Sequence, residues 1–338
     1  MELAGECVKR AVEKEPKKAE IYYNKHLYEF SASIMETLDL RAAFRTASAG
    51  NSLVKLLSRM TSDQNINSLR KAVELEPENV TYRASLAGLL SLRIYVEWAG
   101  QQEALMQAGR PFAETFQQAS ALIRENNKRR LVEAEEHFHY VDKMSKDAFP
   151  PLYMLWSILP LADGKPDKAE QYMLRAIALD PQEESYYQTL LYIIVNDGLP
   201  GLQARLKQVA DLLDMKCAVK CTANERRIIA RIRFGEKNYR EAEKQLRAAF
   251  IEDPASFPIR TGLAVTLFKM NRVEEGMAEL RAAEPFAAKA EDADKAHFYS
   301  LTAVLSMLEG DAETAKQRVQ KSLALNPDDP VAKALVKK

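Results

Sequence analysis

Apolar residues recur at helical spacing along most of the chain. Segments 150–181, 257–285 and 297–327 each hold two amphipathic stretches, joined by a short turn and followed by a proline. A stripe of this period is typical of a helix that packs on one face, and the Val and Ile alternation that would indicate strands is not seen. Each segment therefore predicts a pair of helices.

The pairs share one ladder of small residues. Gly164, Ala169, Ala176 and Pro181 are separated by five, seven and five positions. The ladder returns, in full or in part, in three other places: Gly310, Ala315, Ser322 and Pro327; Ala242, Ala249 and Pro254; Ala4, Ala11 and Pro16. An internal repeat of this kind predicts a fold built from repeated structural units.

Each position of the ladder has a physical role. Small residues seven apart lie on one helical stripe and let a neighbouring helix approach closely. Glycine suits the turn between the two helices, because it adopts positive φ at little cost. Proline has no N–H to donate and ends the second helix. One unit is therefore a helix, a tight turn, a second helix and a stop.

Residues 148–338 resemble the tetratricopeptide repeat family, whose unit of about 34 residues carries this Gly, Ala, Ala, Pro ladder. The resemblance implies an all-α fold, a right-handed α-solenoid of antiparallel helix pairs stacked as a superhelix. It is weaker before residue 148, where segments 18–38 and 80–99 predict longer helices. We therefore expect irregular repeats over 1–147 and regular repeats over 148–338.

The charge balance argues against a nucleic-acid partner. The chain has 48 basic and 48 acidic side chains, and its one dense basic cluster, 128–130, is typical of a solvated helix start. No apolar run approaches the roughly 18 residues that a membrane span needs, and the N-terminus lacks the apolar core of a signal peptide. We expect a cytoplasmic protein without a membrane span or a cofactor.

The three cysteines, Cys7, Cys217 and Cys221, are too few for a disulfide framework, which agrees with a reducing compartment. Cys217 and Cys221 would share one helix face beside Lys216 and Lys220, where positive charge favours a reactive thiolate. The pair is either a redox or metal site or two small apolar residues in a connection. We favour the connection.

Segment 133–142 holds the residues with the most suggestive chemistry. At helical spacing Glu136 and Asp142 lie within three positions of His139, and Glu133 lies four positions from His137. This resembles the Glu-x-x-His arrangement of carboxylate metal sites, but that arrangement needs a second, facing set, and none is evident. We favour an exposed polar face and predict neither a metal ligand nor a catalytic residue here.

A concave surface remains as the candidate for function. In stacked pairs the first helix of each pair lines the concave face. The stripe beside its packing positions is mostly apolar, and we predict that it contacts a partner: Met154, Ile158, Gln188, Tyr192, Val195, Thr261, Val265, Phe268, Val304 and Met307. These stripes lack the Lys, Asn and Arg with which some family members clamp a terminal carboxylate. The stripe is either a groove for an amphipathic helix or apolar segment, or part of the core.

The two ends differ. Near the N-terminus, Leu3, Ala4 and Val8 belong to an apolar face without a first helix, so the chain is expected to continue in a longer protein or to pair with another subunit. At the C-terminus, segment 330–335 is expected to cover the last pair.

We predict a non-enzymatic scaffold or adaptor that binds a protein or peptide segment in an apolar concave groove. One alternative is a structural protein that assembles with copies of itself through the uncovered N-terminal end. The other is a metal-dependent enzyme centred on segment 133–142.

Overall fold

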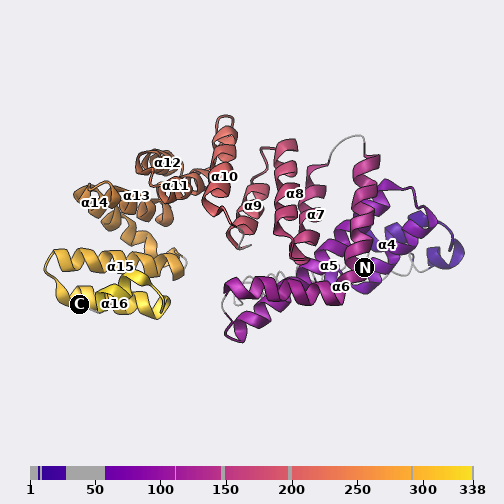
Figure 1. Ribbon diagram of the computed structural model, residues 1–338, viewed down its shortest axis with the longest axis horizontal. Coiled ribbons are helices and arrows are strands. Elements are labelled where there is room, and N and C mark those ends of the chain that lie inside the picture. The colour runs from indigo at the N-terminus through magenta and orange to yellow at the C-terminus, as the bar shows by residue number, and fades with distance from the viewer. Residues whose placement is uncertain are drawn as a thin grey trace. The chain divides into compact units, whose positions relative to one another are not determined.

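The computed structural model describes residues 7, 10–27, 58–110, 112–145, 149–196, 200–290 and 292–336 (Figure 1). Every regular element in these ranges is helical, and none of these helices is long and apolar enough to cross a membrane. Residues 10–14 and 19–27 are helical. The helices that follow are α4 (Asp63–Leu75), α5 (Val80–Gln107), α6 (Phe112–Met144), α7 (Pro150–Ala162), α8 (Pro166–Leu179), α9 (Glu184–Asn196), α10 (Leu202–Cys217), α11 (Ala223–Gly235), α12 (Tyr239–Glu252), α13 (Phe257–Lys269), α14 (Val273–Ala283), the 3-10 helix η3 (Glu284–Lys289), α15 (Asp292–Leu308), α16 (Ala312–Leu325) and α17 (Pro330–Val336).

The chain divides into two compact units, Met1–Leu202 and Gln203–Lys338, here called unit 1 and unit 2. The expected change from irregular to regular repeats at 147/148 falls inside unit 1. Helices α5 and α6 of unit 1 have 28 and 33 residues, whereas α7 and α8 have 13 and 14. In both units consecutive helices pack as pairs, so the predicted all-α solenoid of helix pairs is confirmed.

Helix α6 is bent at Asn127, where φ and ψ are −117° and 15°. The bend is held by a polar network, because buried Asn127 donates to Glu97 of α5 at 2.7 Å. Arg130 in turn donates to the Glu97 carboxylate and to the side-chain amide oxygen of Asn127, at 3.1 and 2.9 Å. A buried polar group needs hydrogen-bond partners, and these contacts with Glu97 and Arg130 stabilise the bend at Asn127.

The predicted tight turns are confirmed at both ladder glycines. Gly164 and Gly310 have φ of 73° and 83°, and Asn271 takes 60° at the equivalent turn. Lys237 takes 62° in the turn between α11 and α12. In each turn the next residue donates its N–H to a carbonyl five positions back, as Lys165 does to Pro160 at 2.7 Å. This is the bond of a Schellman motif, which lets the chain reverse after the first helix.

The small residues of the ladder lie at helix crossings, as predicted. Ala169 and Ala176 of α8 and Ala242 and Ala249 of α12 are fully buried. The prolines end the second helices: α8 stops at Leu179 and α12 at Glu252, each two residues before its proline. The ladder therefore predicted the architecture of the individual pairs.

Helix α17 packs against α15 and α16, with Ala332 fully buried, so the expected cover of the last pair is confirmed. The apolar face predicted around Leu3, Ala4 and Val8 lies outside the described residues.

Candidate binding groove

Unit 2 holds a groove of about 420 Å³ between the first helices of successive pairs, α11, α13 and α15. Its lining combines apolar and charged side chains: Arg227, Ala230, Arg231, Phe234, Leu246, Pro258, Thr261, Gly262, Val265, Thr266, Asp294 and His297. A concave surface with a few polar groups on an apolar floor is the usual form of a ligand site.

Two of the predicted contact residues, Thr261 and Val265, line this groove. Val265 is half-buried and offers an apolar surface on α13. Thr261 is buried, and its hydroxyl donates to the carbonyl oxygen of Phe257 at 3.0 Å. Its polar atom is therefore engaged within the helix.

Phe268, Val304 and Met307 lie outside the lining of this groove. The Phe268 ring packs against α14 at Gly276: a Cβ on that glycine would lie 2.5 Å from the Phe268 Cε1 atom. Phe268, one of the predicted contact residues, thus belongs to the contact inside its own helix pair. Val304 is half-buried and Met307 is exposed on α15.

The predicted residues of unit 1 lie on α7 and α9. Met154 and Ile158 are half-buried, and Gln188 is exposed. Tyr192 and Val195 keep 38% and 58% of their surface accessible. The Tyr192 hydroxyl lies 3.5 Å from the side-chain oxygen of Gln102 on α5, and burial of the hydroxyl raises the pKa of Tyr192 to about 12. The tyrosine therefore stays neutral at physiological pH.

Arg227 and Arg231 are groove residues that the stripe analysis missed, because it did not include α11. A local signal for them exists, since Thr222 and Glu225 form a capping box that starts this helix. Arg227 and Arg231, four positions apart, then share one helix face. The capping box predicts where α11 begins, and from that start both arginines can be assigned to one face of the helix.

The two arginines differ in their partners. Arg227 donates to the side chain of Asn224 at 2.9 Å. Arg231 is exposed and makes no hydrogen bond or ion pair with any residue in the described ranges. Arg233, two positions on, instead contacts three carboxylates, Asp211, Asp214 and Glu236. Arg231 is thus a cation at the groove without a partner in the described ranges, whereas the Arg233 guanidinium is paired within the fold.

The side chains of segment 133–142 have separate partners. Glu133 pairs with Arg70, His137 with Arg83, His139 with Trp156 and Asp142 with Tyr153. Burial and the Arg83 cation lower the pKa of His137, which keeps it neutral. No three metal-ligating groups of this segment come together in the described parts of the chain. The geometry therefore offers no support for the enzyme alternative.

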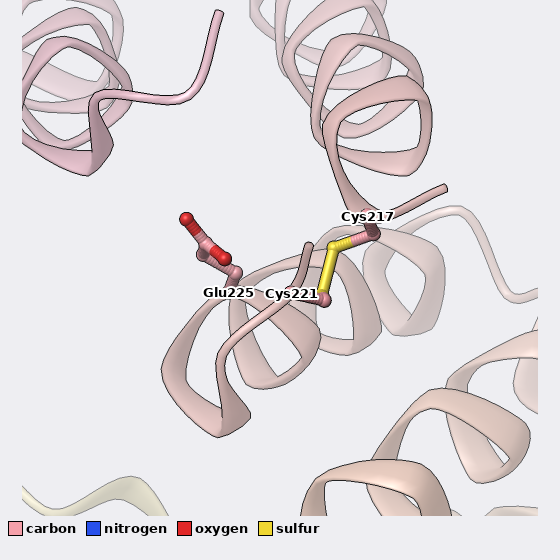
Figure 2. Close-up of side chains that lie close together, drawn as sticks. All are labelled: Cys217, Cys221 and Glu225. Atoms are coloured by element: carbon pink, nitrogen blue, oxygen red, sulfur yellow. A yellow bond between two sulfur atoms is a disulfide. The ribbon is translucent and has the colours of Figure 1, made fainter. Parts of the chain in front are cut away.

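The expectation that Cys217 and Cys221 are two small apolar residues in a connection is wrong. Cys217, the last residue of α10, and Cys221, in the turn before α11, form a disulfide (Figure 2). Beside it lies a buried ion pair, in which Lys216 and Glu225 keep 4% and 0% of their side-chain surface accessible. Spacing alone could not predict the bond, because the chain leaves the helix between the two cysteines and brings their sulfur atoms together. Cys7 is a free, exposed thiol.

Stacked helix pairs define the class of protein, an all-α helical repeat protein. The sequence profile of the tetratricopeptide repeat family matches residues 233–305. The family match covers this part of unit 2, and the ladder and the turns described above are features of the same kind of repeat. No curated protein matches the sequence.

Among solved structures, the chain is similar to a tetratricopeptide repeat protein from Parabacteroides merdae, at 15% identity, over 92% of this chain and 98% of that one, with a TM-score of 0.47. It is also similar to YrrB, described as a TPR protein with an unusual peptide-binding site, at 14% identity over 60% and 98% of the two chains, with a TM-score of 0.43. PilF of Pseudomonas aeruginosa is similar at 12% identity over 68% and 100%, with a TM-score of 0.46. These likenesses concern the fold.

Proposed function

We propose that this chain is a non-enzymatic scaffold that binds an extended or helical segment of a partner protein. The groove between α11, α13 and α15 of unit 2 holds that segment. The observation that carries the proposal is the exposed, unpaired guanidinium of Arg231 next to the apolar side chains of Phe234 and Val265.

The groove's chemistry selects the kind of segment. Arg227 and Arg231 provide cationic donors that match a carboxylate, and Arg does so bidentately. Phe234 and Val265 provide apolar surface for one side chain of the partner. The proposed ligand therefore carries an Asp or Glu side chain, or a terminal carboxylate, close to an apolar side chain.

Selection of peptides from a displayed random library tests this function. We expect selection on the immobilised chain to enrich sequences in which an acidic residue lies within a few positions of an apolar one. For a selected peptide, Arg231→Glu should weaken binding at least about tenfold, since a hydrogen bond to a charged group contributes about 1.5–3 kcal/mol. Binding should also weaken as salt is raised.

Arg240→Glu is the matched control. Arg240 is an exposed cation on α12, outside the groove, so its reversal changes the net charge by the same amount. Equal losses of peptide affinity from Arg231→Glu and Arg240→Glu would mean that net charge, and not a contact in the groove, causes the loss. Enrichment of purely apolar or basic peptides would contradict the acidic ligand, and failure to enrich any family of sequences would contradict a binding role for the groove.

A further inference from the structure

The turn between α10 and α11 brings together three groups that are metal ligands in many proteins. Cys217, Cys221 and Glu225 are four positions apart, and their sulfur atoms and one carboxylate oxygen lie within 4.8 Å of one another (Figure 2). All three belong to unit 2. The donors of a tetrahedral zinc ion lie about 3.6–3.8 Å apart, as zinc–sulfur and zinc–oxygen bonds of about 2.3 and 2.1 Å require. Small movements would therefore complete the site once the disulfide opens.

We propose that the reduced turn binds one thiophilic divalent cation, zinc above all, through Cys217, Cys221 and Glu225. Opening the disulfide needs a cellular dithiol: its two electrons and two protons convert the S–S bond into two S–H groups, and the dithiol itself becomes a disulfide. The incoming cation then displaces the two thiol protons to solvent and bonds both sulfur atoms.

Two hydrogen bonds hold the Glu225 carboxylate in place. One of its oxygens accepts from the Lys216 ammonium group, and the other accepts from the backbone N–H of Thr222 at 2.8 Å. Each carboxylate oxygen has two lone pairs, so Glu225 can bond a cation without losing either partner. Ligating carboxylates are normally held by such outer hydrogen bonds, which fix their direction.

The charge of the site favours a divalent ion. Lys216 and Glu225 form a neutral pair in an almost fully buried place, where an uncompensated charge is costly. Two thiolates and one divalent cation add no net charge to that pair. Thiolate ligands select zinc over magnesium or calcium, and a fourth position stays open to water because both cysteines are only half-buried.

Cobalt titration of the full chain tests the site. The protein is reduced with a phosphine under nitrogen and titrated with Co²⁺, whose colour reports its ligands. We expect one Co²⁺ per chain, visible bands of a four-coordinate ion and a near-ultraviolet band of sulfur-to-cobalt charge transfer. One equivalent of Zn²⁺ should remove all of these bands.

Variants separate the proposed ligands from other thiols. Cys217→Ser and Cys221→Ser should each abolish the two-thiolate spectrum, while Cys7→Ser, which removes the free exposed thiol, should leave it unchanged. Glu225→Gln keeps the size of the side chain and should weaken zinc binding, measured by competition with a coloured chelator. Far-UV circular dichroism shows whether that variant folds; the cysteine variants decide the proposal if it does not.

Two results would overturn the site. One is a reduced wild-type chain that shows only the pale spectrum of six-coordinate cobalt. The other is a charge-transfer band that persists when both Cys217 and Cys221 are serine.

Discussion

The long helices of unit 1 and the ladder pairs of unit 2 reach the same architecture by different means. In α5 and α6, large side chains fill the space: Trp98 stands edge-on to Phe116, and its indole N–H donates to Ser120 at 3.1 Å. In α11 to α13, small residues let the helices approach, with Ala230, Ala242 and others packed against leucines.

The difference shows in what each region tolerates. A crossing built on alanine is set by backbone contact, so added volume is its weak point. A crossing built on stacked aromatics, such as Phe138 and Trp156 with ring centroids 5.4 Å apart, is weakened by lost volume. The sequence carries two tryptophans, Trp98 and Trp156, both in unit 1, so tryptophan fluorescence reports on that unit.

The largest expected effect is the loss of an aromatic side chain from α6. Phe138 is fully buried, so Phe138→Ala should cost about 3–5 kcal/mol. Urea denaturation followed by tryptophan fluorescence should show the shift, and hydrogen exchange of peptides from unit 2 should not change. Equal loss of protection in both units would mean that the two unfold together.

Acid should destabilise unit 1 through His26. Burial lowers the pKa of His26 to about 4, below the ordinary 6.5 of the unfolded chain. Since the unfolded state binds the proton first, stability is full above pH 6.5 and falls as pH drops towards 4, by about 3 kcal/mol in all. Urea midpoints between pH 7 and 4 measure this, and His26→Gln should flatten the dependence. An unchanged slope would assign the acid sensitivity to other groups.

Overpacking a ladder crossing should have a smaller effect. Ala249→Leu in unit 2 and Ala176→Leu in unit 1 should each cost about 1–3 kcal/mol, because both alanines are fully buried. Chemical denaturation followed by circular dichroism measures both. Ala178→Leu, on the exposed face of α8, is the matched control and should be nearly neutral. A loss below about 0.5 kcal/mol at Ala176 or Ala249 would contradict close helix approach there.

The turns should give the smallest effects. At Gly310, with φ of 83° and open space around the site of a Cβ, Gly310→Ala should cost about 1–2 kcal/mol, from backbone strain alone. Lys237→Gly should be neutral or slightly stabilising, because it relieves the same strain at φ of 62°. Thermal melts of the two variants should move in opposite directions or differ by several degrees. Equal destabilisation would show that side-chain contacts, and not φ, decide these turns.

Much of each helix pair could be predicted from the ladder. The turn glycines, the buried alanines and the proline stops concern residues close together in sequence, where helical geometry alone fixes which positions meet. For this reason Gly164, Ala176 and Ala249 lie where the spacing placed them.

The groove could be predicted only in part. Val265 lines it, but Phe268, three positions later, packs against Gly276 inside its own pair. Periodicity predicts which residues share a face of a helix. It does not predict which other helix packs against that face.

The sequence by itself determined the class of fold, because a repeated local pattern encodes a repeated pair of helices. The tertiary structure alone decided which cations remain unpaired and which side chains meet at the turn between α10 and α11. Arg231 and Arg233 are alike in sequence, yet one lies at a groove and the other among three carboxylates. Charge and thiol chemistry depend on atoms within a few ångströms, and those atoms belong to residues that only the folded chain brings together.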